Sequence, residues 1–293
     1  MAIATPAITH RTQHGPWYAV QKALYRVFLT VMLLLALVYV TGPFLWMAIS
    51  SFETRAQLFS RPPTWLPTSL YLENYRSILS DPSVLSCLQN STIVAGFTTV
   101  TALLLGSLAA YAFARMKVPG RNQLFILILA SQMLPGIAIL VPLYVTMRTL
   151  GLIYTYQGLI LAYLSFNLPY VIWLLRAFFI SIPPEIEEAA RVDGCSRVGA
   201  IIRVVLPLSA PGFISTGIFA FIGAWNEFLI ASVMTNNVTK TFPVRMAQFI
   251  GEESTAYEHM FAAAVLGTIP VLILVLIFQR YIIRGITEGA VRM

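Results

Sequence analysis

The chain has 293 residues, of which 58% are hydrophobic and only 11% are charged, and its mean hydropathy is +0.77. A soluble domain rarely carries so little charge, so the composition predicts a protein that resides in a lipid bilayer. No polar stretch is long enough to bury a core of its own, which excludes a separate soluble domain. The formal charge of +7 is not arranged as a basic stripe with interleaved aromatic residues, so no nucleic-acid partner is expected.

Six uncharged intervals run along the chain. Each is longer than the roughly 20 residues that a helix needs to cross about 30 Å of hydrocarbon. We therefore predict an all-α, polytopic membrane protein with six transmembrane helices. The intervals cover residues 27–52, 82–114, 122–147, 149–175, 204–226 and 259–279.

The Lys and Arg residues are distributed unequally between the two sides of this six-helix arrangement. Thirteen fall on the side that carries both termini, and six fall on the other. Because positively charged flanks resist translocation, both termini and the loop 182–207 are predicted to be cytoplasmic. The expected organisation is a cytoplasmic arm over 1–26, a transmembrane domain over 27–284 and a cytoplasmic tail over 285–293.

A polar, proline-containing segment, Gln132-Met133-Leu134-Pro135-Gly136, interrupts the third interval. Proline removes a backbone donor and glycine loosens the chain, so the sequence predicts a kink here. Irregular backbone is tolerated at membrane depth only where protein or water faces it. Two interpretations follow: a kink that serves helix packing, or a solute path faced by Gln132 and the freed carbonyl groups.

Polar side chains within the other intervals are further candidates for a solute path. Glu227 is the one acidic residue within a predicted span, and an acid in a membrane favours a functional role. Counting about 1.5 Å per residue from Ser209 places Glu227 near the outer interface. At that depth, anchoring of a helix end or pairing with a partner subunit explains it as well as solute contact does. The uncharged candidates, which can hydrogen-bond hydroxyl groups without trapping an ion, are Tyr163, Ser165, Asn167 and Asn226.

The polar segment after the fourth interval is predicted to form two short helices. Consecutive prolines end the preceding helix, and Pro184 suits the first position of a new one. Glu187 and Arg191 stand four residues apart, so we expect them to pair. Gly194 supplies the stop at the end of the first helix. The second helix has an apolar stripe that by periodicity alone also fits a helix lying on the membrane surface, formed by Val198, Ile201, Ile202 and Val205.

The spacing within this segment is Glu188-Ala189-Ala190, three residues, Gly194, nine residues, Val204, one residue, Leu206-Pro207. It resembles the cytoplasmic signature loop of the permease subunits of bacterial ATP-binding-cassette importers, with Val204 where isoleucine is usual. Other stretches are similar to the smaller, maltose-type permease of the carbohydrate branch, so the resemblance covers nearly the whole chain from the first helix onward. These stretches are Leu72-Glu73-Asn74-Tyr75, Tyr111-Ala112-Phe113-Ala114-Arg115, Pro119-Gly120-Arg121, Trp225-Asn226-Glu227-Phe228 and 285–291.

The resemblance implies that the loop is a coupling element, which docks in a groove of a separate ATPase subunit. It also implies a bacterial inner-membrane location, a second permease in a heterodimer, two ATPase subunits that bind ATP and Mg²⁺, and an extracytoplasmic solute-binding protein. No cofactor is expected in this chain. The ATPase-coupling residues that it implies are Glu188, Ala189, Ala190, Gly194, Leu206 and Pro207.

Motifs that would give the chain catalytic chemistry of its own do not occur in the sequence. There is no Gly-x-x-x-x-Gly-Lys-Ser/Thr loop to hold ATP phosphates. His10, His14 and His259 lack metal-ligand spacing. We therefore expect a non-catalytic subunit with no catalytic residue and no metal site. The alternative is an ion-coupled secondary transporter, which would need coupling acids or broken helices near the midplane in repeated halves.

The substrate class rests on two observations that disagree. The resemblance favours a saccharide of two or more units, most specifically an alginate oligosaccharide. The sequence places no arginine near the middle of a predicted span, and this favours a neutral sugar over a uronate. Both alternatives stay open at this point.

Overall fold

The computed structural model describes residues 16–62, 65–67, 69–117, 119–250 and 256–290. This described part is built of helices and turns, with no strand. Four helices are each long and apolar enough to cross a membrane, and two bent helix pairs bring the possible spans to six. The predicted all-α, polytopic class is therefore confirmed.

The four unbroken long helices are α1 (Pro16–Ser50), α4 (Pro82–Arg115), α7 (Tyr156–Ser181) and α14 (Tyr257–Ala290). The first bent pair is α5 (Arg121–Ser131) with α6 (Gly136–Thr149), and the second ends in α11 (Ala210–Trp225). The shorter elements are α2 (Arg55–Leu58), α3 (Glu73–Ser80), α8 (Pro184–Val192), α9 (Arg197–Ala200), the π-helical η1 (Ile201–Val205), α10 (Leu206–Leu208), α12 (Leu229–Met234) and α13 (Phe242–Ala247).

Several helix ends differ from the predicted ones. Helix α1 already begins at Pro16, within the expected arm 1–26, and residues 1–15 of that arm lie outside the described residues. Helix α14 continues through Ala290, into the expected tail 285–293. The physical reason is that a charge ends an uncharged interval but does not end a helix, because long basic side chains can reach the interface from within one.

Helix α7 is displaced toward the C-terminus relative to its predicted interval, 149–175. Gly151 and Tyr154 have φ values of 68° and 62°, so the chain cannot be helical there. The side chain of Thr155 then caps the helix by accepting a 3.1 Å hydrogen bond from the N–H of Gly158. Arg176 lies inside the helix, which runs on to Ser181.

The angle between the two helices of each bent pair is larger than that of a kink within one helix. Helices α5 and α6 meet at 96°, so the predicted kink at 132–136 is a full break in the helix. The run Arg197–Leu208 meets α11 at 74°. This second bend falls at Ser209, two residues after Pro207.

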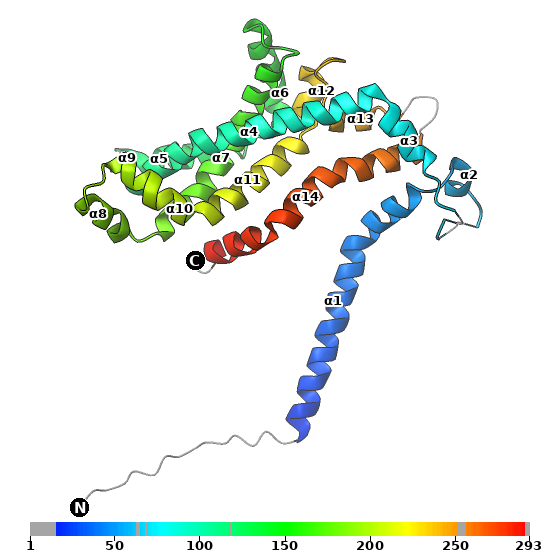
Figure 1. Cartoon of the computed structure of the whole chain (residues 1–293), viewed down its shortest axis with the longest axis horizontal. Helices are drawn as coiled ribbons and strands as arrows, with labels where there is room; N and C mark the ends of the chain where they lie inside the picture. The colour runs from blue at the N-terminus through cyan, green and yellow to red at the C-terminus, as the bar shows by residue number, and fades with distance from the viewer. Residues whose placement is uncertain (1–15, 63–64, 68, 118, 251–255, 291–293) are drawn as a thin grey trace, which may run out of the picture.

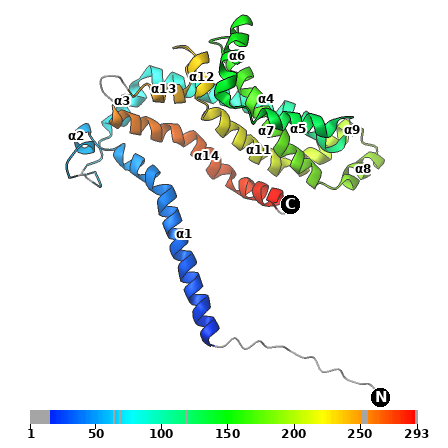
Figure 2. The ribbon, with the colours of Figure 1, turned by 180° about the vertical axis from the view of Figure 1, so that it is seen from behind.

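The two ends of the bundle are formed by different segments. The start of α5 and the α8–α9 loop lie at one end, which we name the loop end (Figures 1 and 2). Helices α2, α3, α12 and α13 lie toward the other, which we name the far end. Helix α1 stands apart from the other long helices in both views. In its most apolar 18-residue window, none of the residues is buried.

Helix α4 packs closely along α7. Ala95, Ala102 and Ala110 are completely buried, and Gly106 lies on the same helix. A Cβ atom added to Gly106 would stand 2.6 Å from Cγ1 of Val171 on α7. Small residues let two backbones approach in a membrane, where lipid is as apolar as the side chains and burial alone does not drive association.

The far end of α4 is tied to the segment between α12 and α13. The side-chain amide of Asn90 donates two 2.8 Å hydrogen bonds, to the carbonyl groups of Val238 and Lys240. The N–H of Phe242 donates to the hydroxyl of Ser91 at 2.8 Å. Five backbone and side-chain groups of this segment and of α4 thereby satisfy one another away from water.

An ion pair at the start of α4 reinforces this attachment. Arg245 on α13 lies 3.0 Å from the carboxylate of Asp81, which also accepts from the N–H of Ser83 at 2.8 Å. Burial acts to raise the pKa of Asp81, but the bonds from Ser83 and Arg245 outweigh it, so that the pKa lies below its ordinary value. The pair is therefore ionised at neutral pH.

The α4–α7 contact gives the first prediction. Gly106→Ala should destabilise the protein by about 1–3 kcal/mol, because the added methyl group collides with the stiff, buried side chain of Val171. Gly96→Ala is the matched control on the same helix, where an added Cβ meets nothing within 4 Å. Thermal unfolding in detergent should show a lower midpoint for the first variant alone. Equal midpoints would contradict the packing described here.

Candidate functional site

The α8–α9 loop takes its shape from proline and glycine. Ile182 and Pro183 have extended ψ values of 126° and 131°, which end α7 before Pro184 begins α8, as predicted. Gly194 has a φ of +93°. The N–H groups of Gly194 and Cys195 donate to the carbonyls of Arg191 and Ala190, at 3.2 and 3.0 Å. The predicted glycine stop at the end of α8 is therefore confirmed.

The loop residues that we expected to contact a partner divide into exposed and packed ones. Glu188, Ala189, Gly194 and Pro207 are exposed. Ala190 is buried within the chain, and Leu206 packs against a buried cluster that includes Val205. We name the exposed members, together with the exposed apolar side chains of the same segment, the loop surface. Its apolar members are Ile186, Val192, Val198 and Ile202.

Glu187 does not pair with Arg191, contrary to our expectation. Its side chain points into the bundle, where the hydroxyl of Tyr111 donates a short hydrogen bond to its carboxylate. The Nε of Arg115 lies 3.8 Å from the same carboxylate. Arg115 also donates to the carbonyl of Ile182. We name Tyr111, Arg115 and Glu187 the loop anchor.

The sequence contained a partial signal for the loop anchor. Tyr111 and Arg115 stand four residues apart, on one face of the last turns of α4, and belong to a stretch that carries the family resemblance. Their partner Glu187 is 76 residues beyond Tyr111 along the chain. Helical periodicity cannot connect residues so far apart. It indicated only a nearby partner for Glu187, which was Arg191, four residues further on.

A second candidate site is a hollow of about 310 Å³ beside the α5–α6 break. It brings together four of the predicted path residues, which come from three separate parts of the chain: Gln132 at the break, Tyr163 and Asn167 on α7, and Glu227 after α11. We name it the polar hollow. Its other walls are Phe166, Tyr170, Phe219, Gly223 and Ile230.

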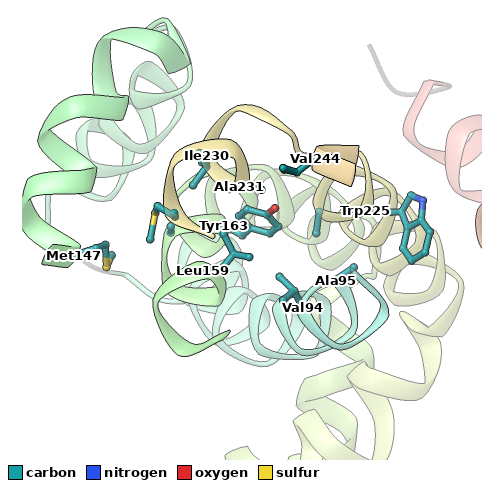
Figure 3. Packing of buried hydrophobic residues seen from close by; sticks show 12 residues of the cluster. Val94, Ala95, Met147, Leu159, Tyr163, Trp225, Ile230, Ala231 and Val244 are labelled. Atoms are coloured by element: carbon teal, nitrogen blue, oxygen red, sulfur yellow. The ribbon is translucent and has the colours of Figure 1, made fainter. Parts of the chain in front are cut away.

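Tyr163 forms the floor of this region. It is almost fully buried, within a cluster to which α4 contributes Val94 and Ala95 and α12 contributes Ile230 and Ala231 (Figure 3). Its backbone carbonyl accepts a 3.0 Å hydrogen bond from the side-chain amide of Asn167. That bond fixes the orientation of Asn167, whose Oδ1 lies on the side of Gly223.

Glu227 lies in the non-helical residues between α11 and α12, so it is not inside a helical span as predicted. Its two carboxylate oxygens accept from the N–H groups of Ile230 and Ala231, at 2.8 and 3.1 Å. A carboxylate at this position satisfies the first free N–H groups of α12. The positive end of the helix dipole in turn stabilises the negative charge of the carboxylate. Of the alternatives left open, anchoring of a helix end is the one that the contacts show.

The remaining candidates lie elsewhere. Asn226 is exposed at the end of α11 and does not line the polar hollow. Ser165 is also exposed, and its hydroxyl donates to the carbonyl of Leu161, one turn earlier. Among the described residues, no group of three or more His, Cys, Asp or Glu side chains is placed to hold a metal ion.

Comparison with known families gives a match over most of the chain. The family described as the inner membrane component of binding-protein-dependent transport systems matches residues 102–288. The sulfoquinovosyl glycerol transport system permease protein of Agrobacterium fabrum is 40% identical over 251 residues, which is 85% of this chain and 88% of the relative. The trehalose/maltose transport system permease protein of Thermococcus litoralis is 36% identical over 281 residues, which is 93% and 99% of the two chains.

A solved structure has the same fold. It is a chain of a bacterial ABC transporter involved in the import of the acidic polysaccharide alginate, and it aligns with a TM-score of 0.75. The alignment covers 89% of this chain and 97% of that chain, at 23% sequence identity. The predicted resemblance to the permeases of carbohydrate importers is therefore confirmed.

The bonds of Glu227 give the second prediction. Glu227→Ala should destabilise the protein by about 0.5–2 kcal/mol, because two N–H groups of α12 lose their acceptors. Glu227→Gln keeps one acceptor oxygen and should fall between this variant and the unchanged protein. Glu185→Ala, at an exposed position on α8, is the control. Thermal unfolding that ranks Ala and Gln equally with the control would exclude the capping role.

Proposed function

The chain belongs to the family of inner membrane components of binding-protein-dependent transport systems, and we propose that it forms half of the path of an ATP-driven oligosaccharide importer. In this role it is a non-catalytic permease subunit. A second, unlike permease supplies the other half, two ATPase subunits bind below, and a solute-binding protein delivers the sugar. The single observation that carries the proposal is the loop surface, which stands outside the bundle while its helix is held from within by the loop anchor.

The loop surface supports docking of an ATPase. It combines the exposed charge of Glu188 with apolar side chains such as Val192, which is 87% exposed. Exposed apolar residues with polar and charged residues around them are typical of protein interfaces. ATP and Mg²⁺ are bound by that partner, because this sequence has no phosphate-binding loop. Glu188, Ala189 and Gly194 are the proposed centre of the contact, with Pro207 at its edge.

The position of α1 supports a second permease subunit. This helix leaves the bundle and keeps its apolar side chains exposed along its length. The polar hollow is also open on one side. A partner permease would cover part of both surfaces, and lipid would cover the rest.

The distribution of charge supports the orientation. In the six-span arrangement predicted from the sequence, the side that includes the loop end carries thirteen of the 19 Lys and Arg residues, so we assign that end to the cytoplasmic face of a bacterial inner membrane. Both termini then lie in the cytoplasm. The far end, with α2, α3, α12 and α13, faces the solute-binding protein.

The chemistry of the polar hollow supports a saccharide. Apart from Glu227, its polar side chains are uncharged amides and hydroxyls, which suit sugar hydroxyl groups, and Phe166, Tyr170 and Phe219 add aromatic faces. Among the residues that line it there is no Lys or Arg, and the carboxylate of Glu227 is occupied by α12. These features favour a neutral saccharide of two or more units. An alginate oligosaccharide is the alternative that the resemblance favours. In that case the partner permease would have to meet its anionic units.

Coupling follows from this arrangement. Closure of the ATPase dimer moves α8 and α9, the bundle rotates against the partner permease, and the polar hollow changes the side of the membrane to which it opens. An ion-coupled secondary transporter, the alternative class, would need an acid available to an ion. Glu227 already accepts a backbone N–H bond of α12 on each of its oxygens, and this disfavours it as the coupling acid.

ATPase stimulation tests the substrate class. The complex of both permeases, two ATPases and the binding protein should hydrolyse ATP faster with maltodextrin or trehalose, and alginate oligosaccharides form the acidic arm of the same panel. Response to the acidic arm alone would replace the neutral assignment. Stimulation by an amino acid or phosphate, and by no saccharide, would contradict the carbohydrate assignment and leave the importer assignment in place.

Crosslinking through the natural thiol tests the docking site. Cys195 follows Gly194 and is partly exposed, whereas Cys87 is buried near the far end. A short thiol crosslinker should join Cys195 to a cysteine placed in the ATPase groove, with a yield that changes when ATP is added. The Cys195→Ser variant should give no product. Labelling of Cys195 by lipid-soluble probes alone would show that the loop lies on the membrane.

A further inference from the structure

We propose that α4 is the mechanical link of this permease, bonded at one end to the coupling helix α8 and at the other to the wall of the polar hollow. In this link, Tyr111, Arg115 and Glu187 are positioning residues at the loop end. Asn90 and Ser91 are their counterparts at the far end. The inference rests on the proposed function, because it assigns the route by which ATPase closure reaches the hollow.

The loop anchor attaches α8 firmly to α4. Tyr111 is 7% exposed and Glu187 is 9% exposed, so their hydrogen bond is shielded from water. Bonds to an ionised carboxylate are stronger than neutral ones, and a buried carboxylate that loses its partners is costly. Arg115 approaches the same carboxylate and donates to the carbonyl of Ile182, at the hinge between α7 and α8. A displacement of α8 therefore pulls on the last turns of α4.

The body of α4 can pass such a displacement on. It is a single helix of 34 residues whose only proline, Pro82, stands at its first position. Two other spans of the bundle are broken, with bends of 96° and 74°. Gly106 and the buried alanines hold α4 against α7, so the two helices move together.

The far end of α4 is bonded to the chain that shapes the hollow. Asn90 donates to the carbonyls of Val238 and Lys240, and its Oδ1 accepts a 2.7 Å hydrogen bond from the hydroxyl of Tyr156 at the start of α7. The segment 238–242 follows α12 after three intervening residues. Ile230 of α12 lines the polar hollow, and Glu227 fixes the first turn of that helix. A shift of α4 is thus delivered to one wall of the hollow.

The experiment measures saccharide transported per ATP hydrolysed in liposomes that contain the complete complex. Tyr111→Phe removes the bond to Glu187 and keeps the ring, and Glu187→Gln removes the charge. Each should lower the transported-to-hydrolysed ratio by roughly 10-fold, which is the scale of one buried bond to a charged group. The amount of assembled complex, measured by copurification of the ATPase, should stay unchanged. Tyr39→Phe and Glu185→Gln, at exposed positions, are the matched controls.

Double variants distinguish a link from two separate defects. Tyr111→Phe combined with Glu187→Gln should lower the ratio no further than the more severe of the two single variants does, because both remove the same interaction. Asn90→Asp replaces the donor that holds Val238 and Lys240 with an acceptor. Combined with Tyr111→Phe, it should lower the ratio little further. Once the bond at one end of α4 is absent, α4 no longer transmits the movement of α8 to its other end.

The outcomes separate this inference from the proposed function. If the unchanged complex neither assembles nor responds to any saccharide, the proposed function fails. If the unchanged complex works and the Tyr111 and Glu187 variants keep its transported-to-hydrolysed ratio, the link fails and the proposed function stands. Loss of assembled complex with an unaltered ratio would show that the loop anchor is structural only, which also overturns the link.

Discussion

The close approach of α4 and α7 is the constraint on which the rest of the bundle depends. In lipid, two apolar helices gain little by burying apolar surface against each other, so they associate where small residues permit extensive contact. Gly106 provides that contact, since a Cβ there would overlap Val171. The pair carries the loop anchor at one end and the bonds of Asn90 at the other. Irregular segments on both sides of the membrane are therefore positioned by one rigid unit.

The same membrane constraint explains where the polar hollow lies. Free backbone groups at membrane depth must be satisfied by protein or water, so a broken span has to face one of them. The α5–α6 break places Gln132 at the hollow, and the non-helical residues between α11 and α12 are stabilised by the carboxylate of Glu227. A helix that faces lipid could not tolerate such irregular backbone. In this bundle the irregular segments instead bring polar groups together, as a site for a saccharide requires. Packing and solute binding, the two interpretations of the third-span interruption, are compatible in this structure.

Local signals in the sequence predicted the local structure well. The prolines before α8 and the positive φ of Gly194 depend on neighbouring residues alone, and the predicted turn geometry is present. Helix ends were less predictable, because uncharged intervals locate the hydrocarbon and helices extend beyond it. The partners of Glu187 required the tertiary fold, since helical spacing offered Arg191 instead. The cap formed by Glu227 is local, to N–H groups three and four residues further on, and anchoring of a helix end was among the alternatives that the sequence left open. The grouping of Gln132, Tyr163 and Asn167 in one hollow could be suggested by polarity but not located.

The central claim is that the coupling helix and the far end of this chain move together as one unit. Double electron–electron resonance tests it directly, with spin labels at Glu185 on α8 and Val238 at the far end, both exposed, and with Cys195 replaced by serine. We expect the mean distance between these labels to stay constant when ATP binds to the complete complex, while the distance from Val238 to a label on the second permease changes. A Glu185–Val238 distance that changes on ATP binding, with no movement of Val238 relative to the second permease, would contradict the account.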